Sequence, residues 1–197
     1  MGKNIEQRVT ELEKMVKKLA DEKGVKFRKK LEAGDTFEAM GLTWTILKIT
    51  EKGYMCLADC LEESKRFGSD NDWKNSNIRA YLNVEFYEKL AEEVGGENII
   101  LFERDLLSMD GQAEYGTCED YVSLISFDEY RENRSLIPNA GYWWWTLTPD
   151  STECNGDSSY IRVVSPSGLI GCNCYYDGFG GRPFCIFSSS LFESEEE

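Results

Sequence analysis

The chain opens with a regular alternation of apolar and charged positions. Between residues 4 and 22 the apolar residues recur at spacings of four, three, four and three, and they are Ile5, Val9, Leu12, Val16 and Leu19. This heptad spacing predicts an α-helix with a narrow apolar seam, which is typical of a coiled coil. So short a helix is marginally stable alone and needs partners. The alternative is an amphipathic helix that packs against its own domain.

The charges beside this seam bear on the number of helices that associate. Arg8 falls at a heptad g position, Val9 at a, Leu12 at d and Glu13 at e. This spacing resembles that of short three-stranded parallel coils, in which the arginine pairs with a glutamate of the neighbouring helix. Valine at a with leucine at d favours two strands instead. Because the charge pattern is the more specific of the two signals, we expect a homotrimer through residues 4–22, with a dimer as the alternative.

After Gly24 the apolar pattern becomes that of a mixed domain. Apolar, β-branched and aromatic runs predict strands at 37–40, 42–49, 54–61, 99–102, 120–126, 160–164 and 183–187. Helical periodicity predicts a helix capped by Asn75 or Ser76, a second over 84–94 and a third over 127–132 capped by Ser126. These elements predict an α+β fold.

Three adjacent tryptophans, at 143–145, precede an acidic loop at 150–159. Successive side chains of a strand point to opposite faces, so at least one ring must lie opposite its neighbours. We expect the run to anchor the core beneath the C-terminal segment, and a stacking platform for a ligand is the alternative. Asp150, Glu153 and Asp157 could hold calcium, although a solvated acidic loop is the simpler interpretation.

The segment from Gly171 to Gly181 has no core pattern. It contains only Gly, Cys, Asn, Tyr, Asp and Phe, so we expect a loop without regular structure that is suited to contacting a ligand. A glycine-rich hairpin loop with a few exposed aromatic residues is the alternative. Every residue from Gly171 to Gly180 can be reached from an asparagine codon by changing only its two adenines, and adenine-directed mutagenesis produces that set.

Composition narrows the classes of function. The 197 residues carry a net charge of −14, which argues against nucleic acid as a partner. No apolar run is long enough for membrane insertion and the polar N-terminus lacks a signal peptide, so we expect cytoplasmic synthesis. The number of cysteines, seven, is odd, and no Cys-x-x-Cys spacing occurs. Both features argue against a disulfide framework. Cys172 and Cys174 could bind a metal, but no histidine is present to assist them, so ordinary loop thiols are the simpler interpretation. We expect no metal site, no cofactor and no histidine general base.

Four segments together resemble a known family. They are Trp-Lys-Asn-Ser-Asn-Ile-Arg-Ala-Tyr-Leu-Asn at 73–83, Tyr-Val-Ser-Leu-Ile-Ser-Phe-Asp-Glu-Tyr at 121–130, Trp-Trp-Thr-Leu-Thr-Pro at 144–149 and Gly-Arg-Pro-Phe-Cys-Ile at 181–186. Their order and spacing resemble a domain of unknown function that is widespread in Firmicutes and their phages. In that family the third segment usually runs Trp-Trp-Leu-Arg-Ser-Pro, from which this chain departs.

The resemblance implies a C-type-lectin-like (formylglycine-generating-enzyme-like) fold with an N-terminal coiled-coil helix. The expected domains are the coiled coil at 1–24, a ligand-binding domain at 25–192 and an acidic tail at 193–197. The same fold occurs in enzymes that hold copper with a pair of thiols. Here the nearest pair in sequence, Cys172 and Cys174, has no polar machinery around it, so we do not expect an enzyme.

The fold is also that of the variable proteins of diversity-generating retroelements. In those proteins a reverse transcriptase rewrites a C-terminal segment with errors at adenines, and the altered side chains bind changing ligands. The resemblance implies that the protein binds a protein or cell-surface ligand and that it is displayed on a phage particle. The ligand-binding residues would be Tyr160, Arg162, Cys172, Asn173, Cys174, Tyr175, Tyr176, Asp177 and Phe179. The alternative is a fixed structural or interaction module of a phage or bacterium, with the same fold and no diversification.

Overall fold

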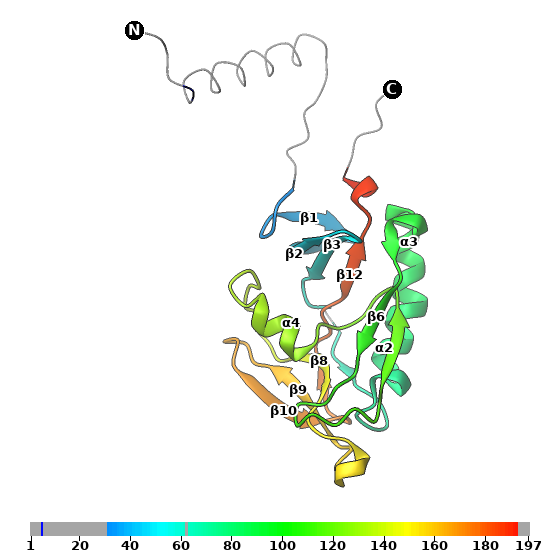
Figure 1. Cartoon of the computed structure of the whole chain (residues 1–197), viewed down its shortest axis with the longest axis vertical. Coiled ribbons are helices and arrows are strands. Elements are labelled where there is room, and N and C mark those ends of the chain that lie inside the picture. Colours follow the sequence, from blue (N-terminus) through cyan, green and yellow to red (C-terminus); the bar gives the residue numbers. More distant parts are fainter. Residues whose placement is uncertain (1–4, 6–30, 62, 193–197) are drawn as a thin grey trace. The chain divides into compact units, whose positions relative to one another are not determined.

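The computed structural model describes residues 5, 31–61 and 63–192 (Figure 1). Apart from Ile5, the predicted coiled coil at 4–22 lies outside these residues, as does the acidic tail at 193–197. Glu32–Phe192 form a compact unit of mixed α+β structure in which the strands pair mostly antiparallel. The predicted α+β class is confirmed at this level.

Strands dominate this unit. They are β1 (Thr36–Ala39), β2 (Leu42–Thr50), β3 (Gly53–Ala58), β4 (Lys65–Arg66), β5 (Ile99–Ile100), β6 (Phe102–Asp105), β7 (Thr117–Asp120), β8 (Trp144–Pro149), β9 (Tyr160–Val164), β10 (Ile170–Cys174), β11 (Gly178–Phe179) and β12 (Phe184–Phe187). One sheet has the order β1-β2-β3-β12-β5, a second has the order β10-β9-β8, and β11-β4 and β6-β7 are two-stranded ribbons. In the view of Figure 1, the two larger sheets lie towards opposite ends of the unit.

A continuous helical segment covers residues 77–94, where two helices are predicted. It consists of α2 (Asn77–Tyr81), the π-helical turn η2 (Leu82–Phe86) and α3 (Tyr87–Val94). The Ser76 hydroxyl caps it by accepting a hydrogen bond from the Arg79 N–H at 3.0 Å. It ends at Gly95, whose φ of 84° is readily adopted only by glycine. The predicted cap at Ser76 and the predicted end of the helix are therefore confirmed.

The predicted strand at 120–126 is wrong. β7 ends at Asp120, and beyond it only an isolated bridge between Ser123 and Phe184 is formed. The reason is that a side chain takes the place of a neighbouring strand. The Asn83 side-chain oxygen accepts hydrogen bonds from the N–H groups of Tyr121 and Val122, at 2.9 and 3.2 Å. These backbone donors are therefore satisfied without a ladder.

Helix α4 (Phe127–Glu132) begins with the predicted cap and is tied to β6. Ser126 and Glu129 form a capping box, in which the Ser126 hydroxyl accepts from the Glu129 N–H and a Glu129 carboxylate oxygen accepts from the Ser126 N–H. The same carboxylate accepts two hydrogen bonds from Arg104, at 2.7 and 2.6 Å. Burial alone would raise the pKa of Glu129, but the charge of Arg104 and these hydrogen bonds lower it below its ordinary value.

Replacing Glu129 with glutamine is expected to destabilise the domain by about 3 kcal/mol, because Arg104 is buried and would lose its counter-charge. The matched control is Asp128→Asn, which breaks the exposed Arg131–Asp128 pair and should cost under about 1 kcal/mol. Urea unfolding measures both.

Because folding lowers the pKa of Glu129, the contribution of this carboxylate to the stability of the domain is present above the ordinary glutamate pKa and is lost as pH falls below that value. The Glu129→Gln variant should lack that part of the acid dependence, and equal costs for the two variants would contradict the prediction.

Candidate functional site

The predicted surface is built on the hairpin of β9 and β10. The two strands pair antiparallel from Val164 opposite Ile170 to Tyr160 opposite Cys174. The turn between them follows the prediction, because Gly168 has a φ of 83° and its N–H donates to the Ser165 carbonyl at 2.9 Å. The prediction that the segment from Gly171 to Gly181 has no regular structure is wrong, since it contains all of β11 and all of β10 except Ile170. Pairing with β9 and β4 supplies the order that its composition does not indicate.

Alternation along the hairpin sorts the predicted residues by face. Ile161 and Val163 are buried, so Tyr160 and Arg162 point to the opposite, outward side. Cys172 lies directly across from Arg162, and Cys174 lies directly across from Tyr160. Directly opposed residues share a face, so these four side chains form one outward patch. Asn173 falls on the other face of β10, where it is partly buried and its side-chain oxygen accepts from the Cys174 N–H.

Cys174 interacts with two tyrosines, Tyr160 of this patch and Tyr176, which follows β10. Hydrogen bonding to Cys174 is the main cause that raises the pKa of Tyr160, and it also raises the pKa of Tyr176. Cys174 is itself buried, whereas both tyrosines are exposed. Both phenols are neutral near pH 7, as an unshifted tyrosine would be, and can donate or accept hydrogen bonds; the raised pKa values extend this neutrality to higher pH.

The Arg162 side chain is held by Asp150, a residue that the sequence suggests as a calcium ligand. Its guanidinium forms an ion pair with Asp150, one of the carboxylates considered for calcium. The Asp157 carboxylate accepts from the Ser159 N–H at 2.8 Å. Within the described part of the chain, no group of three or more His, Cys, Asp or Glu residues is arranged to hold a metal ion. In this structure Asp150 therefore fixes Arg162 at the edge of the patch.

The backbone that follows β10 is fixed by its neighbours. The Tyr175 N–H donates to the Ser159 carbonyl, and the Tyr175 carbonyl accepts from the Phe67 N–H, both at 3.0 Å. The Asp177 N–H donates to the Cys174 carbonyl at 3.1 Å. All these bonds are made by main-chain atoms, so they do not depend on the identity of the side chains. The Tyr176 side chain is 54% exposed.

Phe179 lies apart from the outward patch. Its ring packs 4.8 Å from Trp145 and 6.3 Å from Trp143, measured between centroids. Trp144 and Trp145 are buried and anchor the core as expected, whereas Trp143 is 41% exposed and does not. Trp143 and Phe179 also line an apolar pocket of about 250 Å³. The sequence predicts Trp143 only as one member of the tryptophan run, because no feature of the neighbouring residues distinguishes it from Trp144 and Trp145.

No family model, curated protein or solved structure matches this chain. Within residues 31–61 and 63–192, none of the helices has the length and apolar character needed to cross a membrane. The candidate site is thus an outward patch on an ordered hairpin, in which aromatic and polar groups surround the paired guanidinium of Arg162.

Gly180 fixes the end of this segment, and its replacement by alanine is expected to destabilise the domain by about 1–3 kcal/mol through overpacking. An added Cβ would collide with the buried Cys60 Sγ and would lie 3.3 Å from the Tyr142 ring. The control is Gly178→Ala, whose Cβ would meet only Ser64, at 3.4 Å. Thermal unfolding measures both. In a Cys60→Ala background the cost of Gly180→Ala should shrink, and an undiminished cost would show that the collision is not the cause.

Proposed function

We propose that residues 32–192 form a C-type-lectin-like scaffold and that the chain is a variable protein of a diversity-generating retroelement. It binds protein or cell-surface ligands through the outward patch and the residues that follow it. The observation that supports this most is the combination of an ordered main chain with outward side chains between Gly171 and Gly180. The fold name and the retroelement origin rest on the resemblance of the four sequence segments.

The physical argument is that this segment tolerates change. Main-chain hydrogen bonds to β9, Ser159 and Phe67 hold it, and those bonds survive replacement of the side chains. Cys172 and Tyr176 are exposed, and Tyr175 and Asp177 are partly exposed, so their replacement leaves the core intact. Three positions are constrained, since Cys174 is buried, Phe179 packs on Trp145 and Gly180 has no room for a side chain. Diversification would therefore act on the remaining outward positions.

The chemistry of the patch favours a protein or cell-surface ligand. Tyrosines bury large contact areas at little entropic cost, and their neutral hydroxyls form directional hydrogen bonds. Arg162 adds a charged donor that is already positioned by Asp150. The net charge of −14 makes a phosphate backbone an unfavourable partner.

The fixed structural or interaction module of a phage or bacterium is the second candidate, and nucleotide sequence separates the two. A near-repeat of the codons for residues 154–187 downstream of the gene, differing mainly at adenines and accompanied by a reverse transcriptase gene, is expected for the retroelement protein. If both the repeat and the gene are absent, the result supports the fixed structural or interaction module.

Replacing both Cys172 and Tyr176 with serine is expected to leave the melting temperature within about 3 °C of the parent, because neither side chain supports the core. The control is Phe179→Ser, which removes the ring packed on Trp145 and should cost about 3 kcal/mol. Differential scanning calorimetry compares the variants. A large loss of stability in the double variant would place the patch in the structural core and would remove it as a variable surface.

The chain is also proposed to assemble as a trimer through residues 4–22, which would add avidity to a weak single site. Light scattering should give the mass of three chains. Replacing Leu12, at a predicted d position, with aspartate should reduce the mass to one chain, since a charge in the seam opposes association. The control is Lys14→Asp, outside the seam. A monomeric parent would contradict the proposed trimer, and a mass of two chains would support the dimer.

A further inference from the structure

The chain from Leu101 to Met109 presents an unusual outward face. Alternate residues are buried, and they are Phe102, Arg104, Leu106 and Ser108. The residues between them are exposed, and they are Leu101, Glu103, Asp105, Leu107 and Met109. This face therefore combines carboxylates with large apolar side chains that are 40–44% exposed. It comprises β6 and the extended segment that follows it, and it lies outside the hairpin patch.

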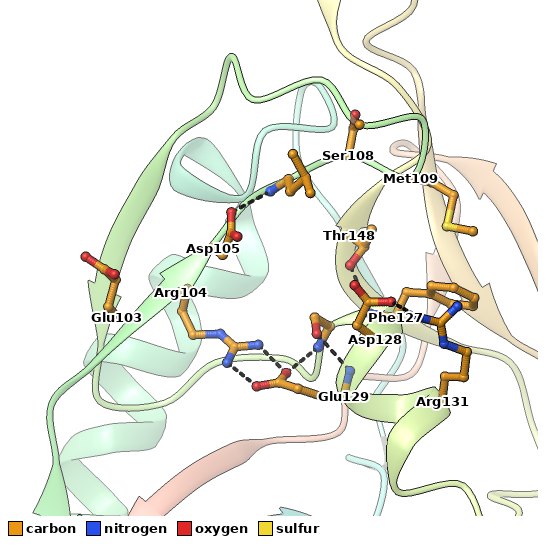
Figure 2. Close-up of a pocket in the computed structure, with 13 residues that line it drawn as sticks. Glu103, Arg104, Asp105, Ser108, Met109, Phe127, Asp128, Glu129, Arg131 and Thr148 are labelled. Atoms are coloured by element: carbon orange, nitrogen blue, oxygen red, sulfur yellow. Dashed lines mark hydrogen bonds and ion pairs between the residues drawn. The ribbon is translucent and has the colours of Figure 1, made fainter.

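A groove of about 470 Å³ runs beside this face. Figure 2 shows Glu103 and Asp105 of β6 on one side of the groove, and Met109 and Phe127 on the other. The paired side chains of Arg104 and Glu129 lie between them. Glu103 and Asp105 thus form an acidic wall, and the opposite wall is mixed, with Met109 and Phe127 beside Asp128, Arg131 and Thr148.

The cations of the groove are already neutralised. Both terminal nitrogens of Arg104 bind the Glu129 carboxylate, and Arg131 pairs with Asp128 at 2.8 Å. Within residues 31–61 and 63–192, neither Glu103 nor Asp105 forms an ion pair. No cation of these described residues therefore pairs with the acidic wall.

The register of β6 and β7 places a further carboxylate, that of Glu119, beside Glu103. Glu103 lies directly opposite Glu119, and like charges in opposed positions of an antiparallel pair repel each other. The nearby Arg79 guanidinium does not compensate, because it pairs with Asp120 and donates to the Glu119 backbone carbonyl. A cationic group placed over Glu103 and Glu119 would relieve this repulsion.

We propose that this groove is a docking site for an extended basic segment of a protein partner. Lysine or arginine side chains of the partner contact Glu103 and Glu119, and an apolar side chain enters the groove beside Leu107, Met109 and Phe127. Charge complementarity selects a basic partner, and the exposed apolar residues select one that also carries aliphatic or aromatic side chains. The proposal depends neither on the hairpin patch nor on its diversification.

The test uses the full chain and a fluorescent peptide of alternating lysine and leucine, seven residues long. Fluorescence anisotropy should show binding at low ionic strength that weakens in 1 M salt, where the Debye length falls to about 3 Å. Replacing both Glu103 and Glu119 with glutamine should weaken binding about tenfold, through the loss of two charge contacts. A peptide of alternating lysine and serine should bind more weakly than the leucine peptide.

Two matched controls separate the groove from a general attraction to an acidic protein. Glu88→Gln with Glu92→Gln removes the same charge from the exposed side of α3 and should leave the affinity unchanged. Leu107→Ser with Met109→Ser should weaken binding, whereas Val84→Ser with Ile49→Ser, at comparably exposed apolar positions, should not. The glutamine variant at Glu103 and Glu119 should melt no lower than the parent. No binding by the parent, or equal losses in test and control variants, would overturn the proposal.

Discussion

The position of β12 is the constraint on which the rest of the domain depends. This strand comes last in the sequence among those of Glu32–Phe192, yet it lies inside the five-stranded sheet, between β3 and β5. All four of its residues are buried. The sheet is therefore incomplete until nearly the whole domain is present, and such long-range pairing slows folding. It also means that the segment from 165 to 183 is held at both ends by strands, β9 and β12, that are paired within sheets.

Arg182 secures the entry to this strand. It is almost fully buried, and it donates hydrogen bonds to the carbonyls of Ala58 and Pro138, at 2.8 and 3.0 Å. Its guanidinium also lies 5.2 Å from the Trp144 ring centroid. Burial lowers the pKa of Arg182, and a buried charge is tolerated only where its donors are satisfied. One side chain thus joins the end of β3, the segment before β8 and the start of β12.

The sequence predicts an element well where its local signal agrees with its surroundings. β9 is predicted to the residue, and the caps at Ser76 and Ser126 are also found. By contrast, β10 carries Gly, Cys and Asn, and its strand conformation comes from pairing with β9, which no local propensity reports. Alternation alone could place Tyr160 and Arg162 on one face. The ion pair of Arg162 with Asp150 depends on the folded chain.

The segments that carry the family resemblance lie mainly in the framework of the domain. Trp73 and Arg79, in the first segment, both donate to the buried carboxylate of Asp120, at 2.7 Å. Trp144 and Arg182, in the last two, are buried together. Their hydrogen bonds and ring contacts make the core specific, and none of these four residues belongs to the outward patch. The residues that would define the fold are therefore distinct from those that would contact a ligand. In the proposed function, this separation would let the binding surface change while the framework stays constant.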